Sequence, residues 1–228
     1  MSLVVNTDTS ISSFEWRTGC EPQVVRVTGE IDSDCIDDFD AAVEAALASP
    51  LSVIPVVIQS GGGDIYAAFH MVATLKRAAM YKPVATCVQG GAASAAAVLF
   101  CAGSMGHRYM APDAMLMVHE VRVEEMAGKM AGMRSETSEM ERLNETMFNI
   151  IESASTKPHE FFTSGVRRTE DLYIDAPTAL EWGIANVIGC PVFTLDVTPV
   201  TRTEVTFKES SSVNSKGKRL KRKRNNQL

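Results

Sequence analysis

Two stretches decide the fold, residues 53–64 (VIPVVIQSGGGD) and residues 83–101 (PVATCVQGGAASAAAVLFC). Each begins as a short run of apolar and β-branched residues, passes through a cluster of glycines and leads into a helical segment. Short apolar runs that end at glycine are typical of strands buried inside a sheet. A strand, a glycine-rich turn and a helix, repeated in this order, predict an α/β domain with crossover helices between its strands.

The segments around this repeat continue the alternation. Residues 23–31 (QVVRVTGEI) are rich in β-branched residues and are expected to form a strand. Residues 32–48 place Ile36, Phe39 and Val43 at spacings of three and four, with acidic residues in the first turn, which is typical of an amphipathic helix. We expect further strands at 107–110 and 115–118 and further helices at 65–80 and 175–186, the last ending at Gly183.

The segment 124–155 differs from the others in its length. Apolar residues recur there at helical spacing, and five of the twelve methionines lie in it. Globular helices usually have about 8 to 20 residues, so we expect a long helix that projects from the domain or packs against another chain. A methionine-rich face adapts to different partners, which suits an oligomer contact. The alternative is a pair of shorter core helices broken near Gly132.

The charge of the chain is unevenly distributed. The 228 residues carry a formal net charge of −6, but residues 216–228 hold seven Lys or Arg and no acid, which leaves −13 for residues 1–215. We therefore expect an N-terminal arm at 1–22, one domain at 23–200, and a polar, basic and disordered tail at 201–228. Such a tail suits contact with nucleic-acid phosphates, with an acidic scaffold protein or with solvent alone, and nucleic acid is not the favoured choice.

The composition excludes several classes of protein. With 45% hydrophobic and 22% charged residues, the chain is too apolar to be disordered. It contains no apolar run of about 18 residues that would span a membrane, and residues 1–15 lack the pattern of a signal peptide. The five cysteines are scattered and form no C-x-x-C pair, so we expect reduced thiols in a cytoplasmic compartment, with no disulfide framework, metal site or cofactor.

Ser94 is the first candidate for chemistry. It lies among Gly and Ala residues where a helix is expected to begin, beside backbone N–H groups that are free to stabilise an oxyanion. Small residues around a serine also fit close helix packing, and the local motif alone does not decide between the two. Two features favour chemistry: residues 60–63 offer a second N–H, and His119 follows a predicted strand, where a general base is useful.

Four stretches, in this order, resemble the ClpP-type serine peptidase family. They are residues 59–64 (QSGGGD), 89–103 (QGGAASAAAVLFCAG), 106–119 (GHRYMAPDAMLMVH) and 171–186 (DLYIDAPTALEWGIAN). The resemblance implies the fold of that family, a spiral of β-β-α units that crotonase-like enzymes share, with a long projecting helix. It also implies a serine endopeptidase that hydrolyses protein or peptide substrates inside a ring-shaped homo-oligomer.

The resemblance further implies a role for each matching residue. Ser94 is expected to be the nucleophile, His119 the general base, and Asp171 the carboxylate that orients His119. The backbone N–H groups of Gly63 and Ala95 are expected to form the oxyanion hole.

The carboxylate has two close competitors in the sequence, Glu170 and Asp175. Asp171 is favoured because it alone takes the family's position before residues 176–183 (APTALEWG). The remaining histidines are expected to have surface or structural roles. They are His70, His107 and His159.

The resemblance leaves two biological settings open. In one, an ATPase unfoldase feeds the chain as a proteolytic subunit in the cytoplasm. In the other, the chain is a head-maturation protease of a tailed bacteriophage, which cleaves scaffold or capsid proteins inside a viral procapsid without an ATPase. The missing Tyr-Ser-Arg-Leu-Leu-like stretch of the family's axial region and the basic tail favour the second setting. Both imply a ring, single or stacked as a double ring, and neither implies a membrane.

Two other classes of protein fit parts of the sequence. A crotonase-like acyl-CoA enzyme shares the spiral fold and the oxyanion hole, but its chemistry does not need an aligned Ser94, His119 and Asp171. A non-catalytic ring subunit or nucleic-acid-binding assembly factor would explain the basic tail, although no aromatic residues are interleaved there to stack on bases.

Overall fold

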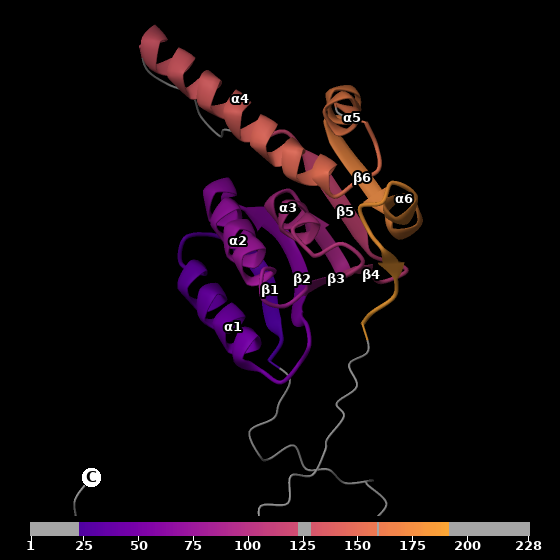
Figure 1. The fold of residues 1–228 in the computed structure, drawn as a ribbon. Helices are drawn as coiled ribbons and strands as arrows, with labels where there is room; N and C mark the ends of the chain where they lie inside the picture. Colours follow the sequence, from indigo (N-terminus) through magenta and orange to yellow (C-terminus); the bar gives the residue numbers. More distant parts are fainter. Residues whose placement is uncertain (1–22, 123–128, 159, 192–228) are drawn as a thin grey trace, which may run out of the picture. The chain divides into compact units, whose positions relative to one another are not determined.

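The computed structural model describes residues 23–122, 129–158 and 160–191. The N-terminal arm at 1–22 and the tail at 201–228 lie outside the described residues, as does the end of the domain expected at 23–200, and all three remain predictions. The described chain alternates strands and helices around one seven-stranded sheet, which confirms the α/β class (Figure 1). None of the described helices is long and apolar enough to cross a membrane.

The elements follow the predicted order with three additions. The strands are β1 (Val25–Ile31), β2 (Ile54–Gly63), β3 (Val84–Ala93), β4 (Arg108–Met110), β5 (Met115–His119), β6 (Asp171–Asp175) and β7 (Val187–Ile188). The helices are α1 (Ile36–Ala48), α2 (Ile65–Ala78), α3 (Ala95–Cys101), α4 (Met130–Ser153), α5 (Phe161–Thr169) and α6 (Ala176–Glu181). The sequence did not predict α5, β6 or β7.

The sheet is built around β3, which has different neighbours along its length. β1, β2, β3, β4 and β7 lie side by side in this order, and each neighbouring pair is parallel. The first part of β3 pairs with β4, whereas its last residues, 91–93, pair with β5. β5 in turn pairs with β6 in antiparallel orientation. The end of β3, which leads to Ser94, is therefore held between β2 and β5.

The two glycine-rich segments are strand ends that stay paired within the sheet, and the prediction that they are turns was wrong. Gly62 and Gly63 belong to β2 and pair with Glu30 and Ile31 of β1. The chain leaves the strand only at Asp64, whose carboxylate accepts a hydrogen bond from a backbone N–H in the first turn of α2 (2.7 Å). Because pairing with β1 continues to the last glycine, the strand end is fixed within the sheet.

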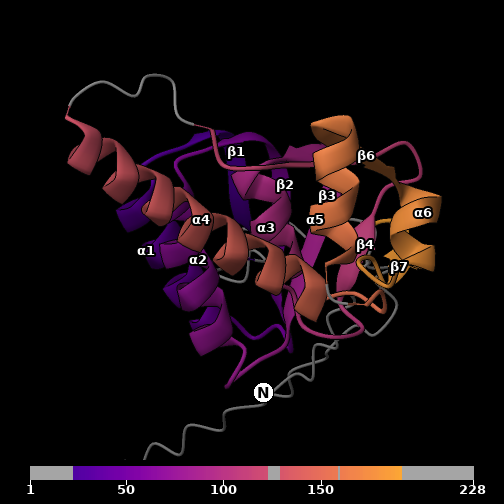
Figure 2. The ribbon, with the colours of Figure 1, turned by 90° about the horizontal axis from the view of Figure 1, so that it is seen from above.

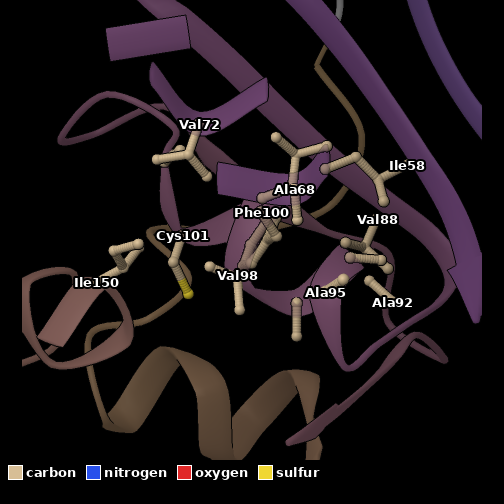
Figure 3. Packing of buried hydrophobic residues seen from close by; sticks show 14 of the residues in the cluster. Ile58, Ala68, Val72, Val88, Ala92, Ala95, Val98, Phe100, Cys101 and Ile150 are labelled. Carbon is tan, nitrogen blue, oxygen red and sulfur yellow. The ribbon is translucent and has the colours of Figure 1, made fainter. Parts of the chain in front are cut away.

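Helix α3 lies at the centre of the hydrophobic core. All seven of its residues are buried, and it packs against β2, β3, α2 and α4. Figure 3 shows Ala95, Val98 and Cys101 of α3 among side chains of the neighbouring elements, including Val72 of α2 and Ile150 of α4. A helix surrounded in this way must be apolar on every side, which explains why the sequence from Ala95 to Cys101 contains only Ala, Val, Leu, Phe and Cys.

Helix α4 is the predicted long helix, and it is continuous through Gly132. It has 24 residues, so the alternative of two helices broken near Gly132 was wrong. The buried residues of α4, such as Leu143, Met147 and Ile151, all lie in its second half, which packs on α3 and α5. The first half extends beyond the other helices in Figures 1 and 2, and Met130 at its start is 67% exposed.

A buried arginine connects the C-terminal part of the described chain to the sheet. Arg108 of β4 is only 3% exposed and has no carboxylate partner within the described ranges. Its guanidinium instead donates hydrogen bonds of 2.6 to 3.2 Å to the backbone carbonyls of Gly103, Ala154, Gly183 and Ile184. Burial lowers the pKa of Arg108. The side chain thus joins the ends of α3, α4 and α6 to β4.

Replacement of this arginine should destabilise the fold strongly. We expect Arg108→Met to lower the free energy of unfolding by about 3 to 5 kcal/mol, because four buried carbonyl groups lose their charged donor. Urea denaturation followed by circular dichroism measures this change. The control is Arg26→Met on an exposed position of β1, which should change stability by about 0.5 kcal/mol or less. Equal effects of the two substitutions would contradict the role of Arg108.

Candidate active site

Ser94 occupies the junction between β3 and α3 in a strained backbone conformation. Its φ is 54° and its ψ is −123°, a combination that residues other than glycine rarely adopt. Its N–H donates to the carbonyl of Met117 in β5 (2.8 Å), and its own carbonyl accepts from Ala97 (3.0 Å). Its side chain makes no capping hydrogen bond with α3. The backbone is therefore held from both sides, and the hydroxyl is not used to cap the helix.

The end of β2 lies directly against Ser94. A Cβ atom added to Gly62 would lie 2.7 Å from the carbonyl oxygen of Ala93, 2.8 Å from Cβ of Ser94 and 3.1 Å from the nitrogen of Ala95. Ala95 is the first residue of α3, so its N–H has no acceptor within the helix. The structure thus brings the end of β2, which contains Gly63, close to the N–H of Ala95, so the two predicted oxyanion donors lie on neighbouring segments.

A cavity of about 570 Å³ opens beside these groups. From the predicted set it is lined by Gly63, Ser94 and His119. The other lining residues come mainly from α2, α4 and the segment after β5, and of the five from α4 three are apolar and two are glutamates. They are Asp64, Ile65, Tyr66, Val121, Arg122, Glu136, Glu139, Met140, Leu143 and Met147. The cavity therefore places a hydroxyl and an imidazole beside a surface with both apolar and charged side chains.

One wall of the cavity is a hydrogen-bonded link between α2 and α4. The hydroxyl of Tyr66 donates to Glu139 (2.6 Å), and Arg142 donates to both oxygens of the same carboxylate (2.6 and 2.8 Å). These bonds, from Arg142 first and from Tyr66 second, lower the pKa of Glu139 to about 2. Tyr66 has a raised pKa because its hydroxyl is bonded to that carboxylate. The link sets how far the first half of α4 stands from α2.

His119 and Asp171 lie directly opposite each other on β5 and β6. Their side chains, however, have other partners. Nδ1 of His119 is 2.5 Å from the carbonyl oxygen of Glu120, and Oδ1 of Asp171 accepts a hydrogen bond from Arg122 (2.6 Å). The structure therefore brings the three predicted catalytic positions together, with Ser94 and His119 at one cavity, but the hydrogen bond between His119 and Asp171 is not formed.

The competing carboxylates have different surroundings. Asp175 caps α6 by accepting a hydrogen bond from the N–H of Thr178 (2.9 Å), and it lies opposite Met115 at the far end of β5. Hydrogen bonding to Thr178, from its side chain first and its backbone second, lowers the pKa of Asp175. Glu170 is the exposed residue that ends α5, with a φ of 65°. Neither is opposite His119 in the strand register.

The other histidines lie apart from this cavity or outside the described residues. Nε2 of His70 is 2.9 Å from Asp40, between α2 and α1. His107 lies in the turn before β4, where its N–H donates to the carbonyl of Ser104 (2.9 Å). His159 is outside the described residues.

Sequence reasoning missed Arg122, Tyr66 and Glu139 as residues of the site. The pairing of Tyr66 with Glu139 joins positions 73 residues apart, and no local pattern marks it. Arg122 follows His119 by three residues, and that short spacing between a base and a cation was the only available signal. The partner of Arg122 was hidden because β6 was not predicted.

Adjacent glycines provide a test of the close contact at Ser94. We expect Gly62→Ala to lower the free energy of unfolding by about 2 to 4 kcal/mol, because Gly62 has a φ of 98° and a new Cβ would meet backbone atoms. Thermal or urea unfolding measures this loss. Gly61→Ala is the matched control, since no atom lies within 4 Å of its Cβ position, and its effect should stay within about 0.5 kcal/mol. If both substitutions changed the free energy of unfolding equally little, the contact between Gly62 and Ser94 would be loose.

Comparison with known proteins identifies the family. The family model described as Clp protease matches residues 20–191. The ATP-dependent Clp protease proteolytic subunit of Porphyromonas gingivalis is 33% identical over 159 residues, which cover 67% of this chain and 69% of the relative. Proteolytic subunit 1 of Bifidobacterium longum is 27% identical over 170 residues, which cover 74% of this chain and 71% of the relative.

A solved structure supports the same fold. A point mutant of ClpP1 from Listeria monocytogenes matches with a TM-score of 0.64 at 22% identity, over 73% of this chain and 91% of that chain. The β-β-α architecture with a long helix, expected from the four motifs, is thereby confirmed. The chain belongs to the Clp protease family and is a ClpP-type serine peptidase.

Proposed function

We propose that the chain is a serine endopeptidase in which Ser94 is the nucleophile, His119 the general base and Asp171 the carboxylate that orients His119. The backbone N–H groups of Gly63 and Ala95 form the oxyanion hole in this proposal. The observation that carries it is the placement of Ser94, in a strained conformation at the start of α3, beside a cavity that it shares with His119. The register of Asp171 with His119 supports the third role.

The proposed reaction follows from these positions. His119 takes the hydroxyl proton of Ser94 as the oxygen attacks the carbonyl carbon of the peptide bond. The negative charge that develops on the carbonyl oxygen is stabilised by the N–H groups of Gly63 and Ala95. His119 then gives its proton to the leaving amine, and an acyl group remains on Ser94. Water activated by His119 releases it and restores the serine.

This chemistry needs one rearrangement of side chains. Asp171 can stabilise the protonated imidazole only when it accepts the hydrogen bond of Nδ1. In the structure, Nδ1 of His119 faces the carbonyl of Glu120 and Asp171 faces Arg122. The backbone positions already suit the hydrogen bond, because directly opposite residues of an antiparallel pair have Cβ atoms about 4.5 to 5.5 Å apart. Rotation of the side chains of His119 and Asp171 would therefore be enough to form this hydrogen bond.

Ser94 should be essential to this activity. We expect Ser94→Ala to lower kcat for a fluorogenic peptide by at least about 10⁴-fold, because both steps of the reaction require its oxygen. A fluorophosphonate probe should label the wild-type chain at Ser94 and should not label the variant, as read by peptide mass spectrometry. Ser52→Ala, at an exposed position before β2, is the control and should keep both activity and labelling. Full cleavage by the Ser94 variant would exclude this residue as the nucleophile.

We further propose that the subunits assemble into a ring through the exposed first half of α4. The exposure of Met130 and the extension of the helix beyond its neighbours support this assembly. A ring would enclose the active sites, so that only unfolded protein chains could reach them. The curated relatives are called proteolytic subunits, a name that supports a multisubunit enzyme acting on proteins.

Assembly can be tested by sedimentation. We expect the native protein to have a mass several times that of one subunit, and Met130→Glu to lower it, because a charge is costly to bury at a subunit contact. Met80→Glu is the control, since Met80 is 80% exposed at the end of α2, away from α4. A monomeric wild-type protein with full peptidase activity would contradict the ring.

Two settings fit the proposed enzyme. The names of the relatives include the words "ATP-dependent", which supports a cytoplasmic subunit fed by an ATPase unfoldase. The basic tail supports head maturation within a procapsid, where it would contact an acidic scaffold. Stimulation of protein degradation by an unfoldase and ATP would favour the first setting over the second.

The aligned catalytic positions and the family favour either peptidase over an acyl-CoA enzyme or a non-catalytic subunit.

A further inference from the structure

Arg122 binds the carboxylate that the proposed mechanism assigns to His119. Its Nη2 donates to Oδ1 of Asp171 at 2.6 Å, and the two side chains are 65% and 31% exposed. Arg122 also lines the cavity that contains Ser94 and His119. The guanidinium is therefore close to the reacting groups, although it belongs to none of the predicted catalytic positions.

His119 is engaged elsewhere in the same arrangement. Its Nδ1 lies 2.5 Å from the carbonyl oxygen of Glu120, the next residue in the chain. Asp171 lies directly opposite His119, yet its Oδ1 is bonded to Arg122 while the imidazole faces Glu120. Two other contacts therefore take the place of the catalytic hydrogen bond between His119 and Asp171. They are the hydrogen bond from Arg122 to Asp171 and the contact of His119 with the carbonyl of Glu120.

We propose that Arg122 is a positioning residue that holds Asp171 away from His119, so that the enzyme rests in a state with an incomplete triad. The active state forms when the Arg122–Asp171 hydrogen bond opens and the Asp171 carboxylate rotates to Nδ1 of His119. This inference rests on the proposed function and concerns the regulation of the same site.

Arg122 has other carboxylates to bind when it leaves Asp171. A second cavity of about 560 Å³ is lined by His119, Arg122, Glu120 and Glu170, together with two valines. Glu120 and Glu170 are both exposed, so a guanidinium that turns toward them keeps its hydration. Because Arg122 also faces the cavity of Ser94, a bound peptide lies beside the guanidinium and can change the balance between the two states.

The expected size of the effect is small, since exposed ion pairs are weak and screened by salt. A pair of this kind shifts the balance between two states by about two- to fivefold. The observed rate constant is the intrinsic one multiplied by the fraction of active molecules. The pair therefore acts as an adjustable restraint and not as a complete block.

The test compares Arg122→Gln, Arg122→Lys and the control Arg77→Gln, which removes the same charge from an exposed position near the end of α2. The substrate is a fluorogenic peptide without charged side chains. We expect Arg122→Gln to raise kcat about two- to fivefold at low ionic strength, with a smaller change in KM. Added salt should raise kcat of the wild type and of Arg77→Gln but not of Arg122→Gln. Arg122→Lys should retain the restraint and its salt dependence, because it keeps the charge.

A second measurement does not depend on turnover. A proton shared between His119 and a carboxylate gives a strongly deshielded imidazole N–H signal in the proton NMR spectrum. We expect this signal to be stronger in Arg122→Gln than in the wild type, and Asp171→Asn should abolish it. A wild-type signal as strong as that of Arg122→Gln would overturn the inference, as would a fall in kcat of Arg122→Gln toward the value of Asp171→Asn.

The failure of this inference can be separated from the failure of the proposed function. If Ser94→Ala abolishes activity and Arg122→Gln shows no gain, Ser94 is the nucleophile and Arg122 does not restrain the triad. If the double variant with Ser94→Ala and Arg122→Gln keeps the activity of Arg122→Gln, the assignment of Ser94 is wrong. The NMR comparison then decides the role of Arg122 by itself.

Discussion

The contact between Gly62 and the start of α3 is the constraint on which the site depends. A Cβ at Gly62 would lie 2.7 to 3.1 Å from atoms of Ala93, Ser94 and Ala95, so the two chain segments touch without an intervening side chain. This approach brings two backbone segments with N–H groups to one serine. It also requires β2 to stay in the sheet through its glycines, and pairing with β1 holds them there. The sheet and the site are thus formed by the same contact.

The burial of α3 in the core keeps the start of this helix in contact with Gly62. Every residue of the helix is buried, so its start cannot move away from β2 without opening a cavity. The other end of the helix is fixed by two hydrogen bonds. Thr86 donates to the carbonyl of Phe100 (3.0 Å), and Arg108 donates to that of Gly103 (3.2 Å). Ser94 therefore stands on a helix that is held at both ends, and the strain of its backbone is sustained by packing.

The parts of the fold that depend on local patterns were predicted from the sequence, and those that depend on distant pairing were not. The apolar runs of β2 and β3 and the position of Ser94 follow from residues within a short window. The glycines of β2 were expected to turn because glycine is typical of turns, yet pairing with Ile31 of β1 keeps Gly63 in the sheet. β6 was missed because only its pairing with β5 defines it. His119 and Asp171 were named through family resemblance, whereas their opposite positions are a result of that pairing.

The proposed site therefore combines a rigid part with an adjustable part. Ser94 and the N–H groups near it are fixed by backbone contacts and core packing, which suits groups that must stabilise charge without reorganisation. His119 and Asp171 lie at the end of a short antiparallel pair, and the ion pair that Asp171 makes with Arg122 is partly exposed. Because such an ion pair is weak, the proposed enzyme would change its activity by moving side chains of β5, β6 and the segment after β5, while the proposed nucleophile and oxyanion donors stay in place.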